Sequence, residues 1–411
     1  MKPFLIILSM LATTGLHAQS FGVEGSVSIE GSVINGWNQP KSAVPVVINL
    51  KDRETTVASA EVIIGNQQVA YQLDDLDGDT HADELVFLVD LAAKESKKFK
   101  VTLSSQPQQQ SFEAKVYADM MLDDRKSKHP LITSLEAPGD SYLYNDLYHH
   151  GAAFENELVA YRIYFDQRQN IDIFGKKLRR LELADTHFYT TPEQMQQDYG
   201  NDVLWAGNSV GCGSFKGWNG TAPANIEPVG IRGQRIIAAG PLRTIVEVKD
   251  MGWMGKYNMT QRYTLYAGHR ECEVSISFDR PLADDTFCTG VQKIGPTNST
   301  VKAEGWVHND GVAASWGSDY PEMGKKEQFP PETVGLAVYV PTEYIKDITT
   351  DELNYLFLIG AAGQQRLHYY VSFCADKENE GYHSANEWFK SLDTWKEGID
   401  HPAVVKYNDR P

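Results

Sequence analysis

Two adjacent histidines beside several tyrosines make residues 142–155 the stretch of the chain best suited to proton transfer. Histidine side chains such as those of His149 and His150 can move protons near neutral pH, and a tyrosine such as Tyr148 can act as an acid or a base where a nearby cation lowers its pKa. Gly151 follows the doublet, and a glycine lets the backbone approach a ligand closely. The pattern indicates a catalytic loop, but a surface loop whose aromatic rings only pack together has the same composition.

The residues after this loop predict a strand with a polar face. Arg162, Tyr164 and Asp166 alternate along residues 160–166, so they share one face of a strand. A cation, a phenol and a carboxylate on one face suit a polar cleft. A solvated sheet face with a cross-strand ion pair gives the same pattern.

Residues 205–220 are rich in glycine and include Trp205 and Trp218. The stretch lacks the ending of a phosphate-binding P-loop and the glycine spacing of a dinucleotide site, so it does not predict a nucleotide site. Two tryptophans on a glycine-rich loop suit the stacking of an aromatic face on a sugar ring, whereas packing of both rings in the core is the alternative. Further candidates, which spacing alone does not bring together, are Arg235, Arg243, Arg262, Tyr263, Lys293, Trp316, His368, Tyr370 and His383.

An acidic loop is the one candidate metal site. Asp75, Asp77, Asp79 and Asp83 are close in sequence, and carboxylate oxygens at alternate positions suit Ca²⁺. Gly78 comes too early for an EF-hand, and no flanking helices are expected. The loop therefore predicts either a structural calcium site or an acidic hairpin turn, and no cofactor is required for catalysis.

The overall charge limits the classes of partner. A net charge of −17 argues against nucleic acid, which needs a basic surface, and an anionic ligand would need a local cluster of Arg and Lys. The chain has no HExxH motif, which argues against the common zinc hydrolases. Of the four cysteines, Cys272 and Cys288 are placed to pair, but all four are equally suited to burial as small apolar residues.

The first residues resemble a signal peptide. A single cation precedes an apolar run at residues 4–11, and Ala18 provides a small residue before a cut. We expect residues 1–18 to be removed and the protein to be periplasmic or secreted. No later apolar run is long enough for a membrane span. The oligomeric state is not predicted.

Strands dominate the elements that must position these groups. The strand segments are rich in β-branched and aromatic residues and are bounded by Gly, Pro or Asp. They cover residues 85–89, 160–166, 244–249, 259–266, 271–278, 334–340, 355–359 and 367–373. Two short helices are expected, one with Pro192 in its first turn and one after Ser384.

The fold class is therefore all-β, with large antiparallel sheets. A polar stretch at residues 104–111 suggests a boundary between two units. We expect a smaller N-terminal β unit over residues 19–108 and a larger one over residues 109–411. The larger unit holds the candidate catalytic loop and the tryptophans.

The segment 148–176 resembles a family of bacterial domains of unknown function, and residues 75–87 and 205–213 fit the same family. Its members occur in loci that degrade uronic-acid polysaccharides such as pectin and ulvan. The family is similar in architecture to the β-supersandwich of sugar mutarotases and of some polysaccharide lyases. One branch is associated with an oligosaccharide dehydratase, which removes water from a terminal uronic acid and leaves a C4–C5 double bond.

This resemblance implies an enzyme that acts on a uronic-acid oligosaccharide. Its base would take the C5 proton, an acid would protonate the departing hydroxyl, and a cation would hold the carboxylate. The candidate catalytic residues are Tyr148, His149, His150, Arg162 and Tyr164. The candidate substrate-binding residues are Arg168, Trp205, Trp218, Arg262, Lys293 and His368. A mutarotase and a non-catalytic sugar-binding protein are the alternatives.

Overall fold

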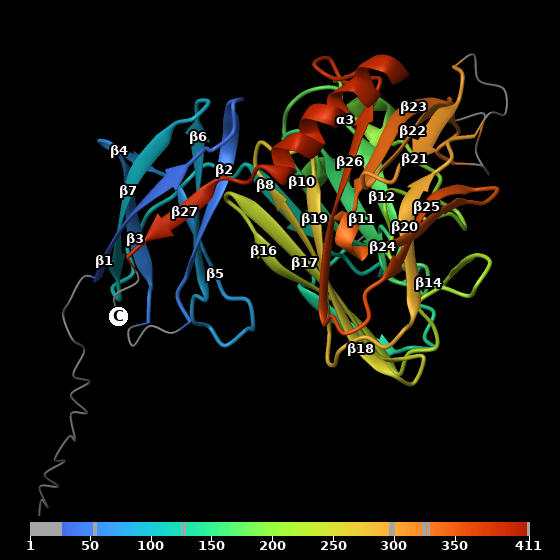
Figure 1. Cartoon of the computed structure of the whole chain (residues 1–411), viewed down its shortest axis with the longest axis horizontal. Coiled ribbons are helices and arrows are strands. Elements are labelled where there is room, and N and C mark those ends of the chain that lie inside the picture. Colours follow the sequence, from blue (N-terminus) through green and yellow to red (C-terminus); the bar gives the residue numbers. More distant parts are fainter. Residues whose placement is uncertain are drawn as a thin grey trace, which may run out of the picture.

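The computed structural model describes residues 27–51, 56–124, 126, 129–295, 301–322, 326 and 329–408. The predicted signal peptide, residues 1–18, lies outside the described residues. Strands dominate, and they form several antiparallel sheets in two units that lie side by side (Figure 1). The mostly β fold class is confirmed.

The smaller unit is a sandwich of a five-stranded and a three-stranded sheet, in the orders β27-β1-β7-β3-β4 and β2-β6-β5. Alternating residues of both sheets, such as Val46, Ile48 and Val101, fill its core. Its strands are β1 (Val27–Ile34), β2 (Lys41–Asn49), β3 (Ser59–Ile64), β4 (Gln67–Val69), β5 (Tyr71–Asp74), β6 (Glu84–Leu91), β7 (Ser96–Ser104) and β27 (Val404–Tyr407).

The last strand of the described chain thus belongs to the first unit. Gly31 of β1 lies opposite Tyr407 of β27, and the side chains of Val405 and Tyr407 pack against the core of the smaller unit. From the sequence, these residues are expected in the larger unit, residues 109–411. Four residues are too few for an alternating pattern to indicate which sheet a strand joins.

A nine-stranded sheet forms the backbone of the larger unit, in the order β21-β22-β23-β26-β19-β18-β17-β16-β9. Its strands are β9 (Ser134–Pro138), β16 (Ile231–Ala239), β17 (Arg243–Trp253), β18 (Tyr257–Tyr266), β19 (Cys272–Phe278), β21 (Glu304–Val307), β22 (Val312–Asp319), β23 (Glu332–Tyr339) and β26 (Arg366–Ala375). Strands β18 and β19 alternate buried and half-exposed residues, so one face of this part of the sheet is apolar and the other polar.

Two five-stranded sheets complete the larger unit, in the orders β13-β12-β11-β10-β8 and β15-β14-β20-β25-β24. The first contains β8 (Val116–Asp119), β10 (Gly151–Asn156), β11 (Ala160–Tyr164), β12 (Ile171–Gly175) and β13 (Asn201–Asp202). The second contains β14 (Lys216–Trp218), β15 (Pro223–Ala224), β20 (Thr286–Gln292), β24 (Ile345–Thr350) and β25 (Asn354–Gly360).

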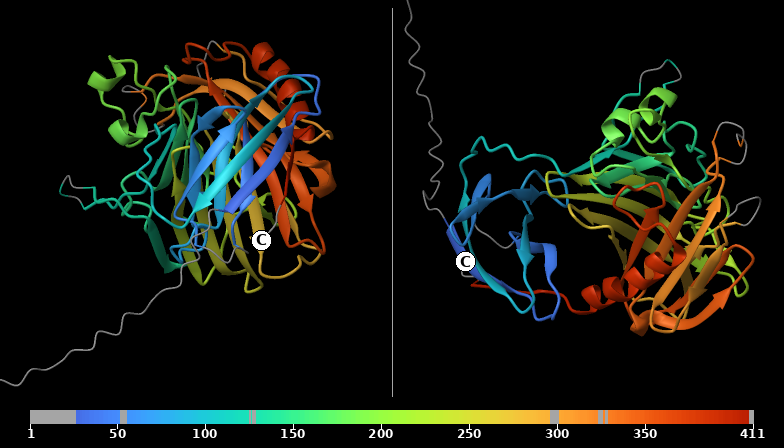
Figure 2. Two further views of the ribbon diagram at one scale, coloured as in Figure 1. Left: turned by 90° about the vertical axis from the view of Figure 1, so that its left-hand side faces the viewer. Right: turned by 90° about the horizontal axis from the view of Figure 1, so that it is seen from above.

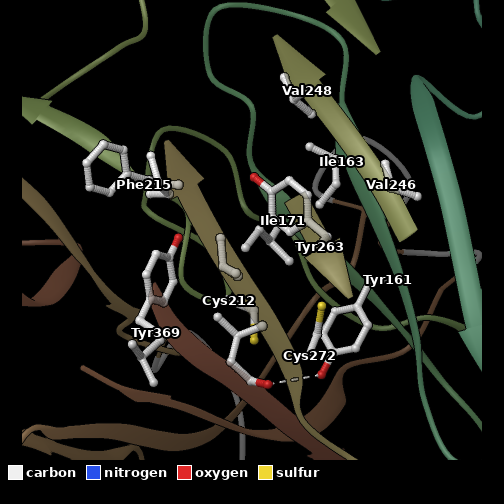
Figure 3. Packing of buried hydrophobic residues seen from close by; sticks show 14 of the residues in the cluster. Tyr161, Ile163, Ile171, Cys212, Phe215, Val246, Val248, Tyr263, Cys272 and Tyr369 are labelled. Carbon is white, nitrogen blue, oxygen red and sulfur yellow. Dashed lines mark hydrogen bonds between the residues drawn. The ribbon is translucent and has the colours of Figure 1, made fainter. Parts of the chain in front are cut away.

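The core of the larger unit lies between the apolar faces of these sheets. Phe154 of the β8–β13 sheet contacts Tyr263 of the nine-stranded sheet, with ring centroids 6.4 Å apart. Tyr161 contacts Phe373 in the same way, with ring centroids 5.2 Å apart. Figure 3 shows Tyr161, Tyr263 and Tyr369 packed together in this cluster. The apolar face of the β8–β13 sheet is thereby fixed, which leaves its other face for polar groups.

Helices are few, as expected, but one is longer than predicted. Helices α1 (Leu183–Thr186) and α2 (Pro192–Met195) are single turns, whereas α3 (Ala385–Asp400) has 16 residues. Ser384 caps α3, and its Trp388 and Leu392 pack on the outer face of β22 and β23. The prediction of a short helix was wrong because this packing extends the helix well past its capping signal. One 3₁₀ turn, η1 (Thr342–Tyr344), is also present.

All four cysteines are buried and unpaired: Cys212, Cys272, Cys288 and Cys374. The alternative of small apolar residues therefore holds, and the pairing of Cys272 with Cys288 does not. In the part of the chain that the structure describes, every helix falls short of the length and apolar character needed to cross a bilayer.

A buried arginine joins the two units. The guanidinium of Arg243 on β17 donates to Asp74 at 2.7 Å and to Glu84 at 2.5 Å, both in the smaller unit. Next to it, the side-chain oxygen of Gln72 accepts from the backbone N–H groups of Leu242 and Arg243. Arg243 and Asp74 are almost fully buried, so each charge depends on the other for compensation.

Replacing Arg243 with Met should destabilise the protein strongly. Asp74 would remain buried without its cation, and removing one partner of such a pair costs about 3–5 kcal/mol. Urea unfolding monitored by tryptophan fluorescence measures the change. Arg280→Met is the control, because Arg280 pairs with Asp279 on the surface and should change stability little. Equal effects of the two substitutions would contradict the proposed role of Arg243.

Candidate active site

Four adjacent strands of the β8–β13 sheet place a row of polar groups side by side. In register, Asp119 lies opposite Ala153, Ala153 opposite Arg162, and Arg162 opposite Asp172. Directly paired residues share one face of a sheet, and this is the face turned away from the core. The small Ala153 leaves room for its larger neighbours. The row thus brings two carboxylates and one guanidinium onto one surface.

Arg162 is the centre of this row. Its Nη2 donates to Asp172 at 2.6 Å and to Asp202 at 2.8 Å, and its Nη1 donates to the Tyr189 hydroxyl at 3.3 Å. The guanidinium also lies 4.1 Å from the ring centroid of Phe188. Burial opposes the charge, but the surrounding acidic groups raise the pKa of Arg162. Arg162 is therefore a buried cation whose donors are taken by the protein.

The segment between β12 and β13 covers this polar face. It contains α1 and α2, which project from one end of the larger unit (green in Figure 2). Phe188 and Leu183 pack on Ala153, Ala160 and Phe174 of the sheet. His187 and Phe188 have φ angles of 46° and 68°, which only a few per cent of non-glycine residues adopt. Backbone strain of this kind gathers at functional sites.

His150 lies on an aromatic stack at the edge of the cluster. Its ring is parallel to that of Tyr144, with centroids 3.8 Å apart, and its Nδ1 is 2.8 Å from the Tyr144 carbonyl oxygen. In the tautomer that donates this hydrogen bond, Nε2 is left to accept a proton. Burial lowers the pKa of His150 to about 4, so its imidazole is neutral at pH 7. Its φ of 68° is a third strained position at this site.

Arg168 joins the same stack with part of its guanidinium exposed. The guanidinium lies 4.9 Å from the Tyr144 ring centroid and 5.2 Å from that of Tyr164. Asp166 accepts from its Nε at 2.7 Å and from its Nη2 at 2.5 Å. Among the described residues, its Nη1 has no hydrogen-bond partner. Unlike Arg162, Arg168 therefore retains a donor for an anionic ligand.

The other histidine of the doublet, His149, points into the protein. His149 is fully buried, and its Nε2 lies 2.9 Å from Oδ1 of Asp119. The other oxygen of Asp119 is 3.5 Å from Nδ1 of His187, a half-exposed residue whose pKa is raised by this nearby carboxylate. Burial raises the pKa of Asp119, but the two histidines outweigh it and the net pKa is lowered. Asp119 thus orients two imidazoles.

The tyrosines of the cluster differ in their access to solvent. Tyr164 is buried and donates to Asp172 at 2.6 Å. The ring of Tyr148 is half-buried between His129 and the edges of His149 and His187. Tyr189 is 38% exposed, and burial raises its pKa to about 12, so its hydroxyl keeps its proton at neutral pH. Tyr189 is therefore the accessible phenol.

Two cavities adjoin the cluster. Tyr189 and Asp202 line a cavity of about 100 Å³ together with Glu322. Trp205, which is 45% exposed, and Lys293 line a second cavity of about 550 Å³. The short segments 202–205 and 319–322 contribute to the walls of both cavities, so the two lie next to each other.

The structure brings together only part of the predicted set. Tyr148, His150, Arg162, Tyr164 and Arg168 form one cluster, with His149 buried behind it. Trp205 and Lys293 lie in the adjoining cavity. The remaining candidates lie in other sheets: Trp218 on β14, Arg262 on β18 and His368 on β26. Gly151 approaches the neighbouring strand rather than a ligand, because a Cβ there would lie 1.8 Å from the Ile163 carbonyl oxygen.

Three of the four carboxylates of the acidic loop come close together. Oxygens of Asp75, Asp77 and Asp83 come within 4.8 Å of one another, whereas Asp79 is outside this group. The ammonium of Lys51 lies 3.3 Å from Asp77 and 3.4 Å from Asp83, so a positive charge is already present there. Calcium binding at this loop stays a prediction.

Several residues of the cluster were missed from the sequence. Asp119, Asp202, His187 and Tyr189 come from segments without a recognisable motif. Their side chains join the site through strand register and through the covering segment, which local spacing does not reveal. The single usable signal is the run of His187, Phe188 and Tyr189 between two short helices, where aromatic and titratable residues follow one another in a loop.

Comparison with known proteins identifies a family but no activity. Residues 33–405 match the family model described as Domain of unknown function (DUF4861). No curated protein matches the chain. A protein in the glycosyl hydrolase family 38 from Enterococcus faecalis is similar at 10% identity and a TM-score of 0.40, covering 93% of this chain and 48% of that one. An alpha-mannosidase from Enterococcus faecalis V583 is similar at 11% identity and a TM-score of 0.38, covering 93% of this chain and 46% of that one. The chain spans about half the length of these proteins, and neither likeness is close enough to bear on activity.

The lowered pKa of His150 should be visible in the pH dependence of stability. An unfolded histidine has a pKa of about 6.5, so between pH 6.5 and about 4 the unfolded chain binds more protons and stability falls as the pH falls. We expect the free energy of unfolding of the wild type to fall more steeply over this range than that of His150→Asn. Asn tolerates the positive φ. Urea unfolding at several pH values measures both slopes, and equal slopes would contradict the assignment.

Proposed function

Because the chain belongs to the DUF4861 family, whose function is not defined, we propose its function from the site itself. We propose a carbohydrate-active hydro-lyase that removes water from a uronic acid at the non-reducing end of an oligosaccharide. The observation that supports this most directly is the position of His150 beside Arg168, joined through the ring of Tyr144. A neutral base next to a cation with a spare donor suits the abstraction of a proton adjacent to a carboxylate.

The proposed reaction is an elimination across C4 and C5 of the uronate. His150 takes the C5 proton at Nε2, and the electron pair of the C5–H bond forms the C4–C5 double bond. The C4–O bond breaks, and the hydroxyl leaves as water with a proton from a phenol, for which Tyr189 is the accessible candidate. The products are one water and a 4,5-unsaturated uronate.

Arg168 holds the carboxylate in this proposal, and Arg162 does not. Negative charge builds on the carboxyl group as the C5 proton departs, and a fixed cation stabilises it. The donors of Arg162 are taken by Asp172, Asp202 and Tyr189, whereas Nη1 of Arg168 has no described partner. Arg162 instead fixes the positions of the groups around it. This changes the role that the sequence analysis gave to Arg162.

The adjoining cavity suits the rest of the sugar chain. Trp205 offers an exposed aromatic face, and Lys293 lies 5.0 Å from the ring centroid of Tyr355 in the same cavity. Stacking on aromatic rings combined with a cation favours an acidic saccharide. We also propose that the larger unit is a mutarotase-like β-supersandwich and that the protein is periplasmic or secreted.

Incubation with uronate-terminated oligosaccharides should produce species lighter by one water. Mass spectrometry detects the loss, and ultraviolet absorbance of the new double bond follows its rate. An oligosaccharide of the same length with a neutral terminal sugar should stay unchanged. A change of anomer ratio without loss of water would instead indicate a mutarotase, for which the pair of His187 and Asp119 provides the required groups.

Substitution of the base and of the cation should separate their effects. His150→Asn should lower kcat by about 10²–10⁴-fold, the usual contribution of a positioned base. Arg168→Gln should raise KM as well as lower kcat, because it binds the carboxylate in the ground state and in the transition state. Arg179→Gln, an exposed arginine paired with Glu380, is the control. Unchanged rates in both His150→Asn and Arg168→Gln would refute the site.

A further inference from the structure

The polar face of the nine-stranded sheet borders a large groove. Its side chains come from β17, β18, β19 and β26, and the cavity measures about 740 Å³. In register across these strands, Lys249 lies opposite Thr260, Thr260 opposite Ser277, and Ser277 opposite Arg366. Arg262, Ser275 and His368 form the next row in the same way. Hydroxyl groups and the side chains of Lys and Arg therefore share one surface.

This groove lies on the other side of the core from the candidate active site. The apolar face of the β8–β13 sheet packs against the apolar face of the nine-stranded sheet, as the contact between Phe154 and Tyr263 shows. The cluster around His150 and the groove are on the two outer faces of this sandwich, which are separated by the packed core. The groove is thus a separate surface.

The charges of the groove differ from those of the whole protein. The chain has 38 Lys and Arg against 55 Asp and Glu. The groove is instead lined by five basic residues and four acidic ones. The basic residues are Arg235, Arg243, Lys249, Arg262 and Arg366, and the acidic ones are Asp77, Glu84, Glu247 and Glu273.

One buried carboxylate gathers three of these cations. Glu247 is 1% exposed, and its oxygens accept from Nε of Arg235 and Nε of Arg262, each at 2.7 Å. The ammonium of Lys249 is 3.4 Å away. A single negative charge compensates three positive ones, so an excess of positive charge remains at the surface. Arg262 uses its Nε for Glu247, and among the described residues its two terminal nitrogens have no hydrogen-bond partner, so they are left for a ligand in the groove.

Arg366 adds a positive charge that no described carboxylate neutralises. It is exposed, and among the described residues it forms no ion pair or hydrogen bond through its side chain. It lies in the same register row as Lys249, with two strands between them. Neighbouring strands are about 4.8 Å apart, so the two cations are separated by roughly 14 Å. A ligand that meets both must carry anionic groups at intervals.

The smaller unit forms the opposite wall. Arg235 donates to the backbone oxygen of Leu76 at 2.8 Å, and the Arg243 ion pairs join β17 to β5 and β6. These contacts fix the distance between the wall and the sheet face. The groove is therefore a preformed channel rather than an open sheet surface.

We propose that this groove binds an acidic oligosaccharide chain that carries carboxylate or sulfate groups on more than one sugar. The anionic groups meet Lys249, Arg262 and Arg366, and the sugar hydroxyls meet the Ser and Thr side chains between them. The choice of a saccharide rests on the proposed function, whereas the preference for repeated negative charge rests on the groove alone. The groove would bind a part of a polymeric substrate or product that is distant from its reacting end.

Titration calorimetry of the full chain with an oligogalacturonate hexasaccharide tests this proposal. Binding should be measurable at low ionic strength and weaken as salt is added, because salt screens exposed charges. The double variant Lys249→Gln, Arg366→Gln should bind at least about tenfold more weakly, through the loss of two charge-assisted contacts. A sulfated oligosaccharide of the same length distinguishes a requirement for carboxylate from one for charge.

The matched control is Lys98→Gln, Lys100→Gln, which removes the same charge from exposed positions on β7 of the smaller unit. Undiminished binding in the groove variant, equal losses in the two variants, or equal binding of a neutral hexasaccharide would each overturn the proposal. Water loss from a uronate-terminated disaccharide should be unchanged in the groove variant. Absence of water loss with every substrate refutes the proposed reaction alone, because the binding measurement needs no turnover.

Discussion

The candidate site depends on one buried cation, Arg162, which the sheet holds between carboxylates. Its strand position sets it opposite Asp172, strand β13 contributes Asp202, and the covering segment brings Phe188 and Tyr189 to the same guanidinium. An arginine without these partners could not be buried on this face, because an isolated charge in a low dielectric is very costly. The ion pair thus ties the sheet, the covering segment and the cluster of tyrosines into one arrangement, around which His150 and Arg168 take their places.

Much of this arrangement follows from the sequence. Alternation over residues 160–166 predicts that Arg162 and Tyr164 share a face, and the His doublet next to them indicates where proton transfer is centred. The strand segments between residues 244 and 278 are likewise found as β17, β18 and β19. These signals are local, since side-chain alternation along a strand depends only on neighbouring residues.

The rest could not be predicted because it depends on pairing between distant segments. The sequence treats His149 and His150 alike, but Asp119, thirty residues earlier on β8, accepts from His149 and holds it inside the protein. Arg262 and His368 are residues of the kind expected at the site, yet strand order puts them on the opposite face of the core. The length of α3 is set by apolar partners on β22 and β23, and these partners cannot be inferred from the capping residues of the helix.

The pairing of β27 with β1 has a consequence for how the chain matures. Gly31 and Tyr407 face each other across a sheet although nearly the whole polypeptide lies between them. On the ribosome, β1 is made long before β27, and one hydrogen-bonding edge of β1 stays open until residues 404–407 have been translated. A contact of such high sequence separation is slow to form, and an open edge invites pairing with other chains. The five-stranded sheet of the smaller unit is therefore complete only after the whole larger unit has been synthesised.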